Sequence, residues 1–193
     1  TGDDVIDGAV VNNGTLALDA NEVTGIITGT GVITMADDYT VAANITTATL
    51  TFADGKTLLV GGNTITGDIT NNGTVTLATG GDITGTTTMA LSTDVLNLHD
   101  TAIGIVAGTG TINSTQSFSQ AAALNATTLN VDTGVLTLTA AGAHTIATTV
   151  IDDGATLATT GGGATVLTGD VTNNGTLTLA TGDDITGTTT MAD

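Results

Sequence analysis

The stretch DITNNGTVTLATGGDITGTTTMA at Asp68–Ala90 returns almost unchanged as DVTNNGTLTLATGDDITGTTTMA at Asp170–Ala192. The two copies differ at three positions: Ile69/Val171, Val75/Leu177 and Gly81/Asp183. A unit reused this closely indicates an array of similar elements rather than a single globule. Because a catalytic site is usually a unique constellation, the duplication favours a surface, spacer or filament role.

A shorter phrase recurs along the chain, in which a turn of Asn, Asp or Gly precedes alternating Thr and apolar residues. Its clearest instances are NNGTLAL (Asn12–Leu18), NNGTVTL (Asn71–Leu77) and NNGTLTL (Asn173–Leu179). Alternate residues of a strand point to opposite faces, so the pattern predicts one buried apolar face and one exposed threonine face. Equivalent apolar positions recur at roughly 16 to 21 residues, the length of one solenoid coil, with shorter intervals near Thr51–Leu58 and Val131–Leu136.

These features predict an all-β fold, a parallel β-solenoid of about ten coils with a core of stacked Leu, Ile, Val and Ala. The Asn-Gly and Asp-Gly pairs are expected to supply corners with positive φ. Residues 1–193 are expected to form one continuous solenoid segment of a longer array, because Thr188–Asp193 matches a phrase that continues beyond Ile33–Asp38. The alternative is a pair of tandem β-sandwich domains with hairpins closed by NNG and DDG turns.

The composition excludes several classes of function. The net charge is −18, with one basic residue besides two histidines, and nucleic acid binding needs Lys and Arg to displace counterions. No apolar run reaches the ~18 residues of a membrane span, so this segment is not expected to insert into a membrane. The chain has no Cys and no Pro, which excludes a disulfide scaffold and fits unbroken backbone ladders.

Candidate chemical sites are few. Four pairs of adjacent acids occur, at Asp3–Asp4, Asp37–Asp38, Asp152–Asp153 and Asp183–Asp184. Adjacent residues of a strand face opposite ways, so such a pair is a poor catalytic acid/base pair. We interpret these acids as turn residues. GGDITG (Gly80–Gly85) and GDDITG (Gly182–Gly187) are faint echoes of a calcium-binding β-roll phrase, so we expect no cofactor but leave Ca²⁺ open.

Three side chains receive individual interpretations. His99 and His144 are interpreted as lone surface or edge residues, because no Cys accompanies them in the sequence. Lys56, which follows Asp54–Gly55, is expected to point to solvent. With no sign of a catalytic constellation, we expect the chain not to be an enzyme.

The outward threonines form the one surface feature with a sharp functional interpretation. T-x-T steps that stack in register would make a regular hydroxyl and methyl array, as in ice-binding β-solenoids. The steps are irregular in spacing, and Thr is also simply a good residue for an exposed strand. The candidate residues are Thr74, Thr76, Thr137, Thr139, Thr176 and Thr178.

The phrases NNGTLTL, GDITNNGTVTL and IDDGATL resemble those of autotransporter passenger domains and related haemagglutinin-like bacterial adhesins. The resemblance runs through nearly the whole chain, but any Thr-rich β-solenoid would produce such phrases. It implies a secreted β-helix that projects from a bacterial cell surface. No functional residue carries over, because binding loops differ among members of that family.

We therefore expect a non-enzymatic extracellular protein, a stalk, adhesin segment, filament or surface-layer subunit. It would act by rigid projection and by end-to-end or lateral self-association, with a host-surface or glycan ligand left open. An ice-binding protein and a polysaccharide-processing β-helix are the alternatives.

Overall fold

The computed structural model describes residues 6–19, 25–101, 103–139, 143–160 and 165–191. These residues form strands and turns without a helix, which confirms the all-β prediction. Strands about 18 residues apart stack in parallel and form a β-solenoid of about nine turns, close to the ten predicted. Every strand pairing among the described residues is parallel, which excludes the antiparallel sandwich alternative.

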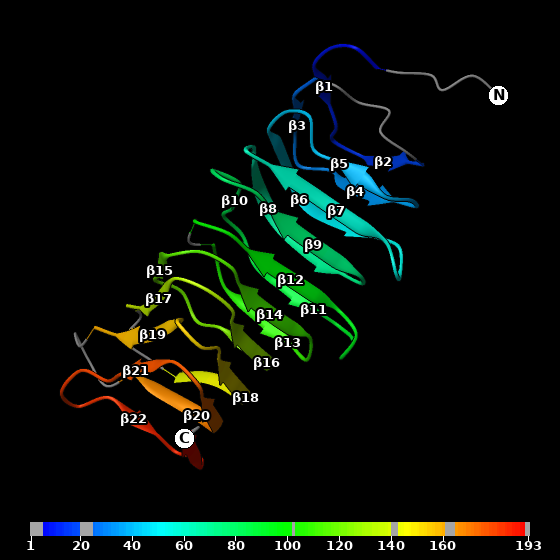
Figure 1. The fold of residues 1–193 in the computed structure, drawn as a ribbon. Coiled ribbons are helices and arrows are strands. Elements are labelled where there is room, and N and C mark those ends of the chain that lie inside the picture. The colour runs from blue at the N-terminus through cyan, green and yellow to red at the C-terminus, as the bar shows by residue number, and fades with distance from the viewer. Residues whose placement is uncertain (1–5, 20–24, 102, 140–142, 161–164, 192–193) are drawn as a thin grey trace.

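The strands are short and follow one another around each turn (Figure 1). The first nine are β1 (Val10–Val11), β2 (Thr15–Leu18), β3 (Ile27–Thr28), β4 (Val32–Met35), β5 (Tyr39–Thr40), β6 (Ile45–Phe52), β7 (Thr57–Gly61), β8 (Thr64–Asn71) and β9 (Thr74–Leu77). The middle seven are β10 (Asp82–Ile83), β11 (Thr87–Met89), β12 (Val95–Leu98), β13 (Val106–Gly108), β14 (Thr111–Ser114), β15 (Phe118–Gln120) and β16 (Asn125–Val131). The last seven are β17 (Val135–Leu138), β18 (Ala143–Ile151), β19 (Thr156–Thr159), β20 (Val166–Asn173), β21 (Thr176–Thr178), β22 (Asp184–Ile185) and β23 (Thr189–Met191).

Each turn contributes to three faces, which we number in the order that the chain visits them. The first face contains β1, β3, β10, β15, β17, β19, β21 and the first halves of β6 and β8. The second contains β2, β4, β11, β13, β22, the second halves of β6 and β8, and the first halves of β16, β18 and β20. The third contains β5, β7, β9, β12, β14, β23 and the second halves of β16, β18 and β20.

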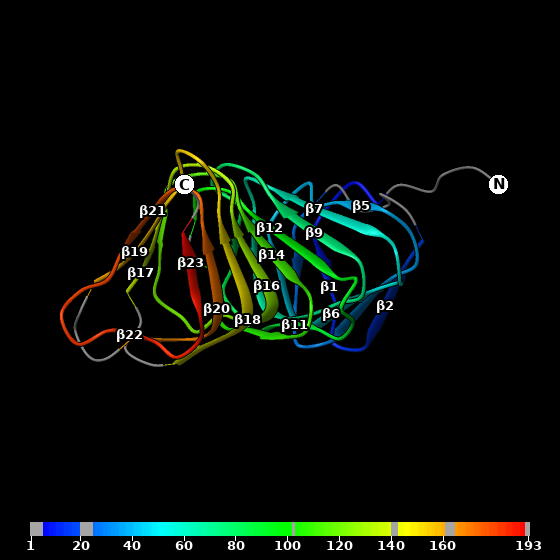
Figure 2. The same ribbon diagram turned by 60° about the horizontal axis from the view of Figure 1, so that its bottom comes forward.

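The three faces are continuous along the stack. Hydrogen bonds between the Gln120 side chain and the Ile103 backbone connect the early and late parts of the first face. The long strands β6, β8, β18 and β20 bend from one face to the next, so they join faces into sheets of nine and ten strands beside one of four. In Figure 2 the strands β12, β14, β16, β18 and β20 lie side by side along the third face.

The core consists of columns of inward aliphatic side chains. On the first face Ile27, Ile45, Ile65 and Ile83 occupy one column, and each has at most 2% of its surface exposed. Burial of one such side chain contributes about 1.5–3 kcal/mol. Because each turn covers the apolar face of the next, this stabilisation accumulates along the axis.

The NNG phrase forms a corner in which the first asparagine points inward. Asn71 is fully buried, and its Nδ2 donates to the Val95 carbonyl of the next turn at 2.9 Å. Its Oδ1 accepts the Gly73 N–H at 3.0 Å and so closes the corner. Asn12 repeats both contacts, with Val32 and Gly14. The motif therefore joins successive turns as well as bending the chain.

The glycine of this corner corrects one sequence expectation. Positive φ occurs at the Asp-Gly corners, at Gly55 and Gly154, but not at the NNG glycines Gly14, Gly73 and Gly175. A Cβ on Gly73 would instead lie 2.2 Å from the Lys56 carbonyl oxygen of the previous turn. Gly73 and Gly175 are therefore required by close packing of two backbones rather than by a left-handed conformation, whereas a Cβ on Gly14 would have no atom within 4 Å.

The duplicated segments occupy different faces. Residues 68–71 belong to the second half of β8 on the second face, whereas 170–173 belong to the second half of β20 on the third. The strands that follow, β9 and β21, are displaced in the same sense, onto the third and first faces. The copies are 102 residues apart, and the pairings from β8 through β11, β13, β16 and β18 to β20 place the second copy five turns and one face further along the stack. The second copy is therefore advanced by one face around the axis.

Candidate functional site

The acidic residues gather at corners and do not converge on one site. Asp3–Asp4 lie outside the described residues. Asp38 accepts the Thr57 N–H of the next turn at 2.7 Å. Asp183 accepts the Thr165 N–H at 2.8 Å, and hydrogen bonds from the Thr159 hydroxyl and from this N–H hold the pKa of Asp183 below its ordinary value. Asp152–Asp153 form an exposed corner after β18. These contacts tie corners to neighbouring turns.

Lys56 forms an ion pair. Its Nζ lies 2.6 Å from Asp37 Oδ1, and its side chain is 37% exposed. The hydrogen bond from Lys56 lowers the pKa of Asp37 and the same bond raises the pKa of Lys56. Lys56 is thus partly exposed, as expected, but it contacts Asp37 rather than solvent alone. A surface pair of this kind adds little stability.

The two candidate calcium phrases run from a turn into a short strand. Asp82 of the first phrase begins β10, and Asp184 of the second begins β22. Within the described residues, no three His, Asp or Glu side chains are grouped in a way that could hold a metal ion. The phrases thus supply strand starts, and the structure gives no ligand set on which to build a metal site.

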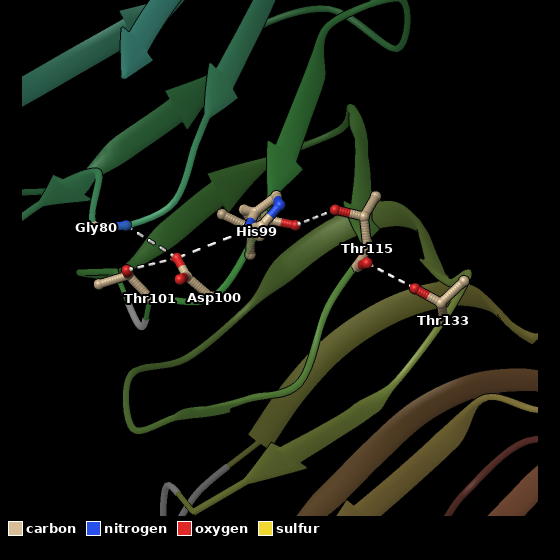
Figure 3. A network of polar contacts seen from close by, with 7 residues as sticks. Gly80, His99, Asp100, Thr101, Thr115 and Thr133 are labelled. Carbon is tan, nitrogen blue, oxygen red and sulfur yellow. Dashed lines mark hydrogen bonds and ion pairs between the residues drawn. The ribbon is translucent and has the colours of Figure 1, made fainter. Parts of the chain in front are cut away.

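His99 belongs to a polar corner between the third and first faces (Figure 3). Its Nδ1 lies 3.7 Å from Asp100 Oδ1, too far for a hydrogen bond. The Gly80 N–H and the Thr101 hydroxyl donate to the same oxygen at 3.1 and 3.2 Å. Chiefly because of the Gly80 hydrogen bond, the pKa of Asp100 is lowered.

Threonine hydroxyls extend this corner along the axis. Thr115 donates to the Leu98 carbonyl at 3.0 Å, and Thr133 donates to the Thr115 carbonyl at 2.6 Å (Figure 3). Each bond joins a turn to the one before it. Along this corner the threonine hydroxyls therefore form a ladder that joins successive turns.

His144 is buried, so its interpretation as a surface or edge residue is wrong. It is 0% exposed and occupies the inward column of the second face between Leu124 and Leu167. Its Nδ1 accepts the Leu124 N–H at 3.2 Å, while its Nε2 has no hydrogen-bond partner within the described residues. Burial lowers the pKa of His144.

The structure separates the predicted threonine array into two groups. Thr74 and Thr76 lie on β9 of the third face, whereas Thr176 and Thr178 lie on β21 of the first. Thr137 shares the first-face column with Thr178, but Ala158 separates them. Thr139 follows β17 and is exposed. The six residues thus form no single surface.

A better threonine column lies on the second face and was missed. Thr34, Thr51, Thr70 and Thr88 are directly aligned on β4, β6, β8 and β11. Their spacing of 17 to 19 residues was present in the sequence and could have identified them. T-x-T steps within one strand do not reveal this column, because its threonines align only between successive turns.

The third face has a side-chain ladder that sequence reasoning also missed. Asn97, Asn113 and Asn130 are aligned on β12, β14 and β16. Asn130 Nδ2 donates to Asn113 Oδ1 at 2.8 Å, Asn113 Nδ2 donates to Asn97 Oδ1 at 2.8 Å, and Asn97 Nδ2 donates to the Thr76 hydroxyl at 3.0 Å. Asparagines at intervals of 16 and 17 residues were the available signal.

No family model, curated protein or solved structure matches this chain. In the part of the chain that the structure describes, no helix is long and apolar enough to cross a membrane.

Proposed function

We propose that this chain is a non-enzymatic structural protein that acts as a stalk, adhesin segment or filament subunit. The observation that supports this role is the continuous parallel ladder over about nine turns, backed by one contiguous apolar core. Stacked turns extend the axis by ~4.8 Å each, so about nine turns extend it by about 40 Å. The core is filled by aliphatic side chains, and the acids hold corners instead of meeting across a cleft.

The proposed location is extracellular, at a bacterial surface. The support is the resemblance of the NNG and DDG phrases to those of surface adhesins. Immunogold labelling of intact cells that produce the full protein tests the location. Surface labelling is expected, and label confined to the cell interior would reject it.

Self-association is the second part of the proposed role, and β23 offers the sharpest test. The Val171 N–H donates to the Thr188 carbonyl at 2.8 Å. In a parallel ladder the N–H groups of successive residues point to opposite sides, so the Thr189 N–H faces away from β20. Another strand added at this edge would use that N–H.

The experiment is sedimentation velocity over a concentration series, with fibre diffraction of concentrated samples. We expect species that grow with concentration and a reflection near ~4.8 Å along the fibre axis. Thr189→Pro removes the outward N–H and should shorten the assemblies without lowering the melting temperature. A monomer at every concentration, without filaments, would contradict self-association.

Ice binding is a second candidate, favoured by the column Thr34, Thr51, Thr70 and Thr88. These residues repeat a hydroxyl and a methyl group at each of four successive turns. The neighbouring column is less regular, because it contains Val32, Thr49 and Asp68. Thermal hysteresis of the purified chain tests the idea, and its absence at millimolar concentration would remove it.

A further inference from the structure

From β7 to β18 the third face has an uncharged outer surface, although the protein is strongly acidic, and Asp170 of β20, aligned with Thr148, ends this stretch. Its outward residues from β7 to β18 form two columns, which together we call the Asn/Thr strip. The strip consists of Thr57, Thr74, Val95, Thr111, Thr128 and Thr148 in one column and Leu59, Thr76, Asn97, Asn113, Asn130 and Val150 in the other. The chain has a net charge of −18, yet none of these twelve residues is charged.

The strip is ordered before any ligand arrives. Three side-chain hydrogen bonds hold Thr76, Asn97, Asn113 and Asn130 in line. An asparagine amide has two N–H donors and two acceptor lone pairs, and the ladder uses one N–H of each asparagine. Each amide therefore retains a second N–H donor. Fixing the amides in advance reduces the side-chain ordering that binding would otherwise cost.

The second column complements these donors. Thr111 and Thr128 lie beside Asn113 and Asn130, two residues earlier on the same strands. Their hydroxyl groups donate and accept hydrogen bonds, while their methyl groups provide apolar contact. On β14 and β16 the strip thus repeats one amide, one hydroxyl and one methyl group, with a rise of ~4.8 Å between the two strands.

A second copy of this chain is a poor occupant for the strip. Six strands, each four residues wide, cover roughly 300–400 Å², whereas a stable interface needs about 800 Å² from each partner. Two copies would also bring their acidic corners together, including Asp132, Asp152 and Asp153 near the end of the strip. Anionic polymers are disfavoured by the same negative field.

We propose that the Asn/Thr strip binds a neutral polysaccharide that lies along the solenoid axis, with about one sugar unit for each turn. An extended β-linked sugar chain is uncharged, advances per ring by a distance similar to the rise of one turn, and presents hydroxyl groups along its edges and C–H groups on its faces. The asparagine N–H groups donate to the sugar oxygens. The threonine and valine methyl groups contact the C–H faces.

All three aromatic residues, Tyr39, Phe52 and Phe118, are buried. The strip therefore binds through edge hydrogen bonds and methyl contacts instead of aromatic stacking. Such contacts are individually weak, so affinity depends on the number of turns engaged.

Cosedimentation of the full chain with microcrystalline cellulose and with chitin tests the proposal. We expect retention on at least one of them and none on polygalacturonate, an anionic comparison. The variant Asn97→Ala/Asn113→Ala/Asn130→Ala should reduce retention about tenfold or more, because several hydrogen bonds are lost together. The matched control is Thr51→Ala/Thr70→Ala/Thr88→Ala, which alters three aligned outward residues on the second face and should bind like the unmodified chain.

A second variant protects the test from misfolding of the triple mutant. Thr128→Lys leaves the asparagine ladder intact and places a long side chain across the strip, so it should also reduce retention. Circular dichroism and melting temperature confirm that each variant is folded.

Failure of both neutral glycans to retain the unmodified chain, or equal retention of the strip variants, would overturn the proposal. Equal binding to polygalacturonate would overturn it as well. The proposal goes beyond the stalk role, because filament formation is measured separately and does not depend on glycan retention.

Discussion

Asn71 shows how one side chain can hold a corner and join two turns. It is fully buried; its Nδ2 donates to the Val95 carbonyl and its Oδ1 accepts the Gly73 N–H. A buried carbonyl or N–H without a partner costs about 1–3 kcal/mol. The inward asparagine is therefore the residue of the NNG phrase that carries most of its stabilising effect.

We expect Asn71→Ala to lower the free energy of unfolding by about 1–3 kcal/mol, because the buried Gly73 N–H loses its partner and the Val95 carbonyl loses one hydrogen bond. Urea denaturation followed by circular dichroism measures the change. Asn174→Ala is the matched control, since Asn174 is the exposed second asparagine of another NNG phrase. Equal losses from the two variants would show that the inward amide is not special.

His144 makes stability depend on pH. Burial lowers its pKa in the folded state, so the unfolded state binds a proton first as the pH falls. Stability should therefore be constant above an ordinary histidine pKa of about 6.5 and decrease below it. No charged side chain of the neighbouring columns contributes to this shift, whose one cause is burial.

The measurement is the urea midpoint between pH 7.5 and 5.5, a range chosen to lie around the ordinary histidine pKa of about 6.5. His144→Leu should flatten this part of the profile, because Leu occupies the neighbouring positions 124 and 167 of the same column. His99→Asn, which alters the partly exposed histidine, should leave the slope in place. A slope that persists in His144→Leu would contradict the assignment.

At the scale of the element, the corner glycine is governed by the turn beneath it. A Cβ on Gly73 would lie 2.2 Å from the Lys56 oxygen, whereas a Cβ on Gly14 would have no atom within 4 Å. Both occupy the same place in an NNG phrase, and neither has a positive φ. The two positions therefore differ in packing alone.

Gly73→Ala should destabilise the fold by about 1–3 kcal/mol through overpacking, and more if the backbone cannot move. Gly14→Ala should be neutral or stabilise by up to about 1 kcal/mol, because alanine restricts the unfolded chain. Thermal unfolding of the two variants side by side checks both signs. Equal destabilisation would indicate that the phrase requires glycine conformationally.

Element type was predictable because the alternation in phrases such as NNGTVTL is visible within seven residues. The assignment of strands to faces was not predictable from the sequence, because it depends on how many faces lie in each turn. The short intervals at Thr51–Leu58 and Val131–Leu136 illustrate this. They separate strands on consecutive faces, β6 from β7 and β16 from β17, rather than strands on the same face one turn apart.

Surface columns were hidden for a related reason. Asn97, Asn113 and Asn130 come together only through pairing between turns, and their spacing differs from that of the NNG phrases. His144 was misassigned because the alternation in GAHTIA, which places it on the same side as the buried Ile146, was not applied to it. The alternation of inward and outward side chains along β18 is interrupted by a register shift between Thr145 and Thr148.

For the whole molecule, a solenoid should tolerate loss of a complete turn. Thr111 and Thr128 are aligned, so deletion of residues 111–127 brings Thr128 into the place of Thr111. We expect the shortened chain to fold with the same circular dichroism spectrum and a lower melting temperature, because one layer of core is lost. Deletion of residues 111–119 removes about half a turn and should abolish cooperative unfolding. Similar behaviour of both deletions would contradict stacking in register.

The rotated duplication has a consequence for how the rod meets its surroundings. Two nearly identical patches that face different directions cannot both rest on one flat surface, so they cannot add avidity toward a single planar target. They can instead engage partners on two sides of the rod, as a crosslink does. Copying a segment at a fraction of a turn therefore spreads the same contact around the axis, which suits a lattice or mesh better than a sheet bound on one side.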